Sequence, residues 1–182
     1  MTGTSGSINS TQMIYGSIGQ YFSPANLATF QAWTNSPLIP AANLIGGHVD
    51  DQKCVIHSNC ADANLDMQYI MTMSPYSPTT YWYSDNWFTG FLSEVANTVK
   101  PPKVISMSYG SLETNMVASV YIGFDTEAIK LGIQGTTILV ASGDDGVSPY
   151  NSRYDRNLCR YEPDYPTTSP YVLGVGGTIV SL

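Results

Sequence analysis

Along this chain, short runs of apolar residues alternate with longer stretches in which apolar residues recur at helical spacing. The short runs predict strands, because apolar runs bounded by turn residues suit the interior of a sheet. The expected strands are Asn43–Ile45, Tyr81–Tyr83, Lys103–Tyr109, Thr136–Ala141 and Tyr171–Val175.

The longer stretches predict helices between these strands. Ser23 is expected as the N-cap of the first helix, because Pro24 suits the first helical position. The other helices are expected from about Ala61 to Met73, from an Asp85 cap to a stop at Pro101-Pro102, and from Val117 to a close at Gly132 and Gly135.

This alternation predicts an α/β fold with a parallel sheet flanked by helices. Ligands of such sheets bind beyond the carboxyl ends of the strands. Three glycine-rich segments follow expected strands, namely Ser108-Tyr109-Gly110, Ser142-Gly143-Asp144 and Gly176-Gly177-Thr178. They are expected to converge on one edge of the sheet, although each could equally serve only as a tight turn. The segment from Val147 to Asp164 is polar and is expected to be an irregular loop.

Asp62 and Asp66 stand four residues apart at the start of a predicted helix. That spacing places both carboxyl groups on one face, roughly 6 Å apart. Carboxylates so close do not ionise independently, so one can act as an acid and the other as a base. The alternative is a solvated helix N-terminus, where acidic side chains suit the helix dipole.

Composition narrows the class of protein. The 182 residues suffice for one domain, with residues 1–12 expected as a flexible tail. Charged residues make up only 12% of the chain, which favours a secreted or vacuolar protein. The net charge of −7 argues against nucleic acid and anionic membranes as partners. No apolar stretch approaches the roughly 20 residues of a membrane span, and no signal peptide is visible.

Three cysteines leave an odd one. Cys54 and Cys60 bracket a short loop and could form a disulfide, which would leave Cys159 to a partner beyond the printed sequence. Two alternatives stay open. The three thiols could be free, or Cys54 and Cys60 could bind a metal with His48 and His57, although their spacing matches no standard zinc pattern.

Five segments, in this order, resemble the sedolisin family of serine-carboxyl peptidases over nearly the whole chain. They are Gln20–Leu27, Ala63–Tyr69, Val104–Gly110, Ala141–Gly146 and Tyr165–Thr178. The resemblance implies a subtilisin-like fold, of which this chain is the N-terminal portion. It also implies cleavage of a peptide or protein substrate at acid pH, in a secreted or lysosomal setting, by an endopeptidase or a tripeptidyl peptidase.

The resemblance also implies roles for individual residues. Asp66 falls on the family's triad aspartate, and Asp62 falls where the family has a glutamate acting as general base. Asp144 falls on the aspartate of the oxyanion hole. Ser108-Tyr109-Gly110 falls on the strand that lines the substrate cleft, and Ser142-Gly143 leads into the oxyanion turn. A carboxylate base stays ionised at roughly pH 4 to 5, where a histidine would be protonated, and a protonated Asp144 can donate to the oxyanion.

The chain departs from the family pattern in two respects. Asp62 is one methylene shorter than glutamate, which can leave the base about 1 Å short of the nucleophile. The family's nucleophilic serine lies in a Gly-Thr-Ser motif further along than Thr178, and here that motif occurs only at Gly3-Thr4-Ser5. We therefore expect the serine, and the family's calcium site, to lie outside this chain, in a C-terminal half or a second chain. This chain alone is expected to be inactive. The alternative is a catalytically inactive scaffold or binding domain, whereas a nucleotide-binding domain is disfavoured because no phosphate-binding glycine motif occurs.

Overall fold

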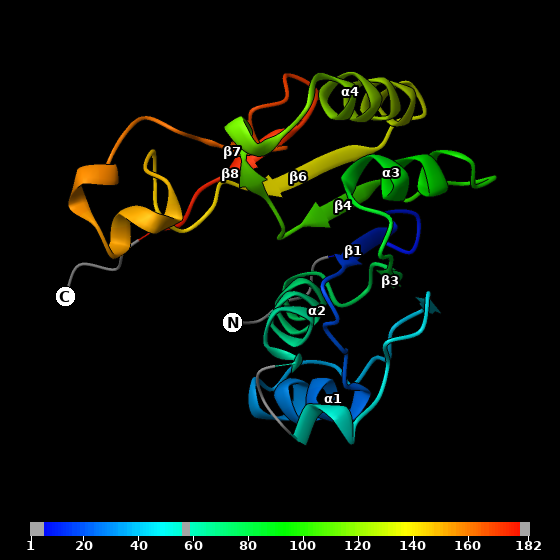
Figure 1. Cartoon of the computed structure of the whole chain (residues 1–182). Coiled ribbons are helices and arrows are strands. Elements are labelled where there is room, and N and C mark those ends of the chain that lie inside the picture. Colours follow the sequence, from blue (N-terminus) through cyan, green and yellow to red (C-terminus); the bar gives the residue numbers. More distant parts are fainter. Residues whose placement is uncertain (1–5, 56–58, 179–182) are drawn as a thin grey trace. The chain divides into compact units, whose positions relative to one another are not determined.

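The computed structural model describes residues 6–55 and 59–178 of the chain (Figure 1). These residues form two compact units. The first consists of the described residues within Met1–Trp87 and Pro102–Ser106, and the second of those within Phe88–Pro101 and Met107–Leu182. No helix within the described ranges combines the length and apolarity that crossing a membrane requires.

The first unit is built on three parallel strands with two helices. The strands are β1 (Gln12–Gly16), β2 (Asn43–Ile45) and β3 (Thr79–Tyr83). β3 pairs with both of the others, so Tyr81 stands opposite Ile14 on one side and Leu44 on the other. The fourth strand, β4 (Val104–Met107), begins beside β1, because Val104 N donates to Thr11 O at 3.2 Å.

The two helices of this unit, α1 (Pro24–Trp33) and α2 (Ala61–Met73), pack against each other (Figure 1). Their apolar side chains form one buried cluster with the strands. The cluster contains Ile14, Phe22, Leu27, Ala63, Met67, Met71, Tyr81 and Tyr83. Burial of these side chains fixes which face of α2 points inward, and therefore where its acidic residues lie.

The second unit has two helices, a parallel strand pair and a short antiparallel ribbon. The helices α3 (Phe88–Ala96) and α4 (Ala118–Ile133) pack together through buried residues such as Phe91 and Phe124. The parallel strands are β6 (Thr137–Ala141) and β8 (Leu173–Val175). The ribbon joins β5 (Ser111–Leu112) to β7 (Asp164–Tyr165), with Leu112 opposite Asp164.

These elements confirm the predicted α/β fold with parallel strands flanked by helices. The bounds of α2 and β2 are those expected. Helix α1 begins at Pro24 as expected, and Ser23 caps it by accepting from Asn26 N at 3.0 Å. Strands β4, β6 and β8 are each shorter than the predicted range. Helix α4 runs through Gly132, and its chain reverses at Gly135, which has φ +83°.

Three expectations about elements were wrong. Asp85 does not cap α3: its carboxylate accepts a hydrogen bond from the Tyr83 hydroxyl, and the helix begins at Phe88. That helix ends at Ala96, well before the prolines. Strand β1 was not predicted, and it starts at Gln12, the last residue assigned to the expected tail. The Gln12 side chain is buried but satisfied, because its Nε2 donates to Thr79 Oγ1 at 2.9 Å.

Candidate functional site

The two candidate acids of the first unit lie one turn apart on α2. Asp62 is in the first turn and exposed, whereas Asp66 is half-buried and its Oδ2 atom is buried. The intervening buried positions, Ala63 and Asn64, face the core. The acids therefore share the flank of the helix, with Asp66 nearer the protein interior. The position of Asp62 also fits the alternative interpretation, in which an exposed acid in the first turn interacts only with solvent and the helix dipole.

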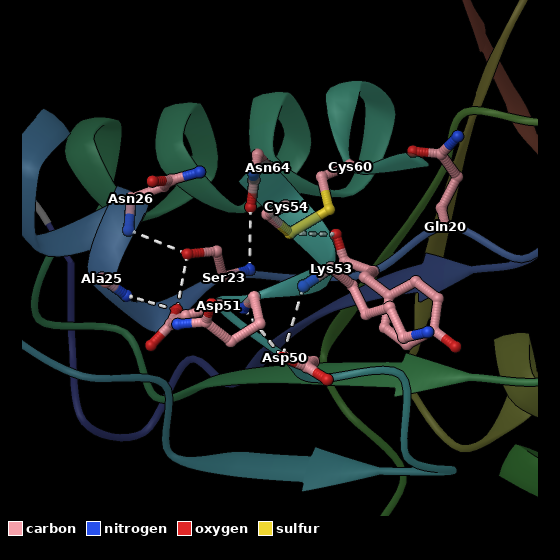
Figure 2. Close-up of a disulfide and its surroundings, with 12 residues drawn as sticks. Gln20, Ser23, Ala25, Asn26, Asp50, Asp51, Lys53, Cys54, Cys60 and Asn64 are labelled. Atoms are coloured by element: carbon pink, nitrogen blue, oxygen red, sulfur yellow. Dashed lines mark hydrogen bonds between the residues drawn. A yellow bond between two sulfur atoms is a disulfide. The ribbon is translucent and has the colours of Figure 1, made fainter. Parts of the chain in front are cut away.

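Three contacts hold the start of α2 in place, and Figure 2 shows two of them, the Ser23–Asn64 hydrogen bond and the Cys54–Cys60 disulfide. The N-cap of α2, Cys60, makes no side-chain cap, so a distant residue contributes instead: Asp62 N donates to Gln20 Oε1 at 3.3 Å. Asn64 Oδ1 accepts from Ser23 N at 2.9 Å, which ties the starts of α1 and α2 together. These contacts fix the segment that presents the two acids.

The third contact is a disulfide between Cys54 and Cys60, the two cysteines expected to pair (Figure 2). Their Cα atoms lie 5.4 Å apart, within the range that a disulfide requires. Since disulfide sulfurs are not thiolate ligands, this bond contradicts the zinc alternative. His48 instead stacks on Tyr83 with ring centroids 3.5 Å apart, and His57 lies outside the described residues. Within those residues, no cluster of three His, Cys, Asp or Glu side chains is arranged to hold a metal ion.

In the second unit, the three glycine-rich segments border two adjoining hollows. One hollow, of about 480 Å³, is lined by Ser108, Gly110, Gly143 and Asp144 among others. The other is lined by Ser142, Gly143, Asp144 and the Gly176–Thr178 segment. Asp144 is exposed and borders both hollows. The expected convergence of these segments is therefore present, although Tyr109 itself is buried.

The turn that carries Asp144 depends on glycine. Gly143 has φ +80°, which disfavours other residues. A Cβ added there would also stand 2.0 Å from Asp164 Oδ2. The turn is tied to the strands, since Ser142 N donates to Val175 O at 2.9 Å and Thr167 Oγ1 donates to Ala141 O at 3.1 Å. These hydrogen bonds fix the backbone of the turn that carries Asp144 beyond the end of β6.

Charged residues that sequence reasoning did not select also line the first of these hollows. Asp145 pairs with Arg153, whose Nη2 donates to Asp145 Oδ2 at 2.9 Å. Burial, followed by the charges of Asp145 and Asp144, raises the pKa of the Asp164 carboxyl above its usual range. Both Arg153 and Asp164 fall in the stretch expected to be an irregular loop. No hydrophobic periodicity in the sequence marks either residue. The position of Asp164 depends on the pairing of β7 with β5, which the sequence did not predict.

The structure therefore gathers the predicted residues into two groups. The first unit brings Asp62 and Asp66 together on α2, next to the Cys54–Cys60 disulfide. The second unit brings Asp144 together with the glycine-rich strand ends. The first group is suited to proton transfer, and the second to hydrogen-bonding a substrate or a developing oxyanion.

The fold places the chain in the subtilisin-like α/β class. It resembles Pseudomonas sedolisin, a serine-carboxyl proteinase solved in complex with pseudo-iodotyrostatin, with a TM-score of 0.72 at 21% identity. That match covers 96% of this chain and 50% of the sedolisin chain. A serine protease of Staphylococcus aureus that processes the epidermin leader peptide matches with a TM-score of 0.52 at 13% identity, over 92% of this chain and 46% of its own.

Sequence relatives identify the family. The tripeptidyl-peptidase sed1 of Aspergillus fumigatus is 35% identical over 65% of this chain and 19% of its own length. Tripeptidyl-peptidase 1 of Dictyostelium discoideum is 31% identical over 94% of this chain and 28% of its own length. The human protein of that name is 29% identical over 96% of this chain and 31% of its own length. No protein-family model matches. The chain belongs to the sedolisin and tripeptidyl-peptidase family, and it spans less than a third of the length of these curated relatives.

Proposed function

We propose that this chain is part of an acid-acting serine-carboxyl peptidase whose nucleophilic serine lies outside it. Asp62 acts as the general base, Asp66 supports it, and Asp144 in protonated form donates to the oxyanion. The observation that carries the proposal is the placement of Asp62 and Asp66 one turn apart on a helix whose start is pinned by a disulfide. The family relationship supports the same assignment.

The proposed chemistry follows from the limits of a serine hydroxyl. Serine is a weak nucleophile and requires a base within hydrogen-bond reach. An ionised Asp62 would accept the hydroxyl proton as serine attacks the peptide carbonyl. Asp66, which lies nearer the core, would hold Asp62 in position and share its proton. Because carboxylates remain ionised at a pH that protonates histidine, this arrangement suits acid conditions.

Asp144 would stabilise the negative charge that develops on the carbonyl oxygen. A donor at that point typically contributes a hundredfold or more to the rate. Only the protonated carboxylic acid can donate, so this contribution disappears as the pH rises. Ser108-Tyr109-Gly110 and Ser142-Gly143 would line the cleft that receives a peptide or protein substrate. Cleavage within a chain and removal of tripeptides from its end are both compatible with these residues.

The family relationship also supports a secreted or lysosomal setting, for which an oxidised Cys54–Cys60 pair is suited. The partner that completes the site would be a C-terminal segment or a second chain. The calcium ion that the family resemblance implies would bind to that partner.

The second candidate is an inactive relative that serves as a scaffold or binding domain. The shorter side chain of Asp62 favours it, because a misplacement of about 1 Å can lower a rate roughly a hundredfold.

The two candidates differ in what happens when the missing serine is supplied. This chain, joined to a C-terminal segment that carries Gly-Thr-Ser, is expected to cleave peptides at acid pH. Asp66→Asn should abolish that activity. Asp144→Asn should keep some activity and extend it to higher pH, because asparagine remains a donor that cannot ionise. Glu127→Gln removes the same charge from α4, away from the hollows, and serves as the control. Full activity of Asp66→Asn would contradict the role assigned to Asp66. A pH–rate profile of Asp144→Asn that ends at the same upper pH as that of the unmutated protein would contradict the role assigned to Asp144.

A further inference from the structure

Three consecutive hydroxyl side chains, Thr167, Thr168 and Ser169, come shortly after β7, and each donates to a different part of the second unit. The buried Ser169 donates from its Oγ to Asp125 Oδ1 on α4 at 2.6 Å. The exposed Thr168 donates from its Oγ1 to Glu113 Oε1, in the short 3-10 helix after β5, at 3.1 Å. These two hydrogen bonds anchor the segment, and they fix where it places Thr167.

The half-buried Thr167 contacts the end of β6. Its Oγ1 lies 3.1 Å from both Val140 O and Ala141 O, so these two carbonyls share its one hydroxyl proton. Gly174 of β8 stands opposite Val140 in the parallel pairing, and a Cβ added there would meet Thr167 Oγ1 at 3.3 Å. The Thr167 hydroxyl therefore lies where β6 and β8 pair, against the last two residues of β6.

The two carbonyls that accept from Thr167 lead directly into the turn that carries Asp144. That turn begins at the next residue, Ser142, whose N donates to Val175 O on β8 at 2.9 Å. The chain changes direction at Gly143, which has φ +80°. The backbone just before this change of direction is thus held by a strand neighbour and by a side-chain hydroxyl.

We propose that Thr167 is a positioning residue, whose hydroxyl fixes the end of β6 and thereby holds Asp144 where the oxyanion develops. This inference rests on the proposed function, which assigns the oxyanion donor to Asp144. A donor is effective only at the place that the carbonyl oxygen occupies in the transition state, and a displacement of about 1 Å can lower a rate roughly a hundredfold. Thr167 itself acts through the backbone of the turn and need not touch the substrate.

The first test is native-state hydrogen exchange at the Ser142 amide of this chain, which needs no catalytic activity. Thr167→Val removes the hydroxyl and keeps the shape of the side chain, so this amide should exchange about fivefold faster, a typical effect of losing one hydrogen bond. Thr167→Ser keeps the hydroxyl and should leave the rate nearly unchanged. Thr168→Val is the matched control, because it removes a hydroxyl that donates to Glu113 and not to β6. An unchanged Ser142 rate in Thr167→Val, or an equal increase throughout β6, would overturn the proposal.

The second measurement uses the chain joined to its serine-bearing segment. Thr167→Val should lower kcat by roughly ten- to a hundredfold and change KM little, because the oxyanion contact strengthens only in the transition state. Thr167→Ser and Thr168→Val should keep kcat near that of the unmutated protein. A higher KM with an unchanged kcat in Thr167→Val, or an equal loss of kcat in Thr167→Ser, would contradict the proposal. If the joined protein is inactive but exchange at Ser142 responds as expected, the proposed function fails while the positioning of the turn by Thr167 stands.

Discussion

In the proposed function, the length of the Asp62 side chain decides how well it serves as the base. The resemblance to the family implies a glutamate at the position of Asp62 and an aspartate at that of Asp66, so Asp62 is one methylene shorter than expected. In a form of the chain joined to the serine-bearing segment, Asp62→Glu is expected to raise kcat/KM, by up to about a hundredfold, because the longer side chain closes a gap of about 1 Å.

Asp66→Glu provides the matched comparison, since it adds the same methylene one turn further along α2. It should lower kcat/KM, because the half-buried Asp66 has less room and would push its neighbour out of position. Steady-state kinetics of both variants at acid pH measures the contrast. If Asp62→Glu lowered kcat/KM as much as Asp66→Glu does, the prediction would be contradicted, because the site would then fit the shorter aspartate base better than a glutamate.

At the scale of elements, a carboxylate strengthens the start of α1. Asp51 Oδ1 accepts from Ser23 Oγ at 2.6 Å and from Ala25 N at 3.1 Å (Figure 2). These hydrogen bonds hold the pKa of Asp51 below its usual range, with the Ser23 bond as the larger cause. A carboxyl whose pKa is lowered by folding stabilises the fold above its unfolded pKa, and that contribution is lost as the pH falls.

Asp51→Asn should therefore lower the free energy of unfolding at about pH 6, and this loss should shrink toward about pH 2, as the Asp51 carboxyl of the unmutated protein becomes protonated. Urea unfolding at the two pH values measures the difference. Asp50→Asn is the control, because Asp50 accepts from Gln52 N and Lys53 N and makes no bond to α1. An equal loss at both pH values in Asp51→Asn would assign the effect to packing.

The loop before α2 depends on the Cys54–Cys60 bond, which spans six residues of sequence. Closing so short a loop is expected to stabilise the fold by about 2 kcal/mol, through restriction of the unfolded chain. The Cys54→Ala/Cys60→Ala variant should lose about that amount in urea unfolding, and Cys159→Ser should lose almost none, since Cys159 is exposed and free. Peptide mapping without reduction checks the pairing directly. A Cys159 link to Cys54 or Cys60, or three alkylatable thiols in native material, would contradict it.

The elements that were predicted correctly are those with local determinants. Ser23 and Pro24 mark the start of α1 in the sequence, and the spacing of buried residues in α2 is visible there too. The failures depend on distant partners. Asp85 resembled a helix cap, but its carboxylate accepts a hydrogen bond from the Tyr83 hydroxyl. Gln12 resembled part of a polar tail, but Thr79 on β3 satisfies its buried amide. Asp164 was missed because its place depends on pairing with Leu112, far away in the sequence.

For the whole molecule, the central claim of the proposed function is that the acids of both units serve one reaction at low pH. The most direct test is the pH profile of peptide hydrolysis by this chain joined to a segment carrying Gly-Thr-Ser, with each part also assayed alone. We expect hydrolysis near pH 4 that falls away toward pH 7, and no hydrolysis by this chain by itself. Hydrolysis by the isolated chain, or a joined protein that folds but shows no acid-dependent hydrolysis, would contradict the account.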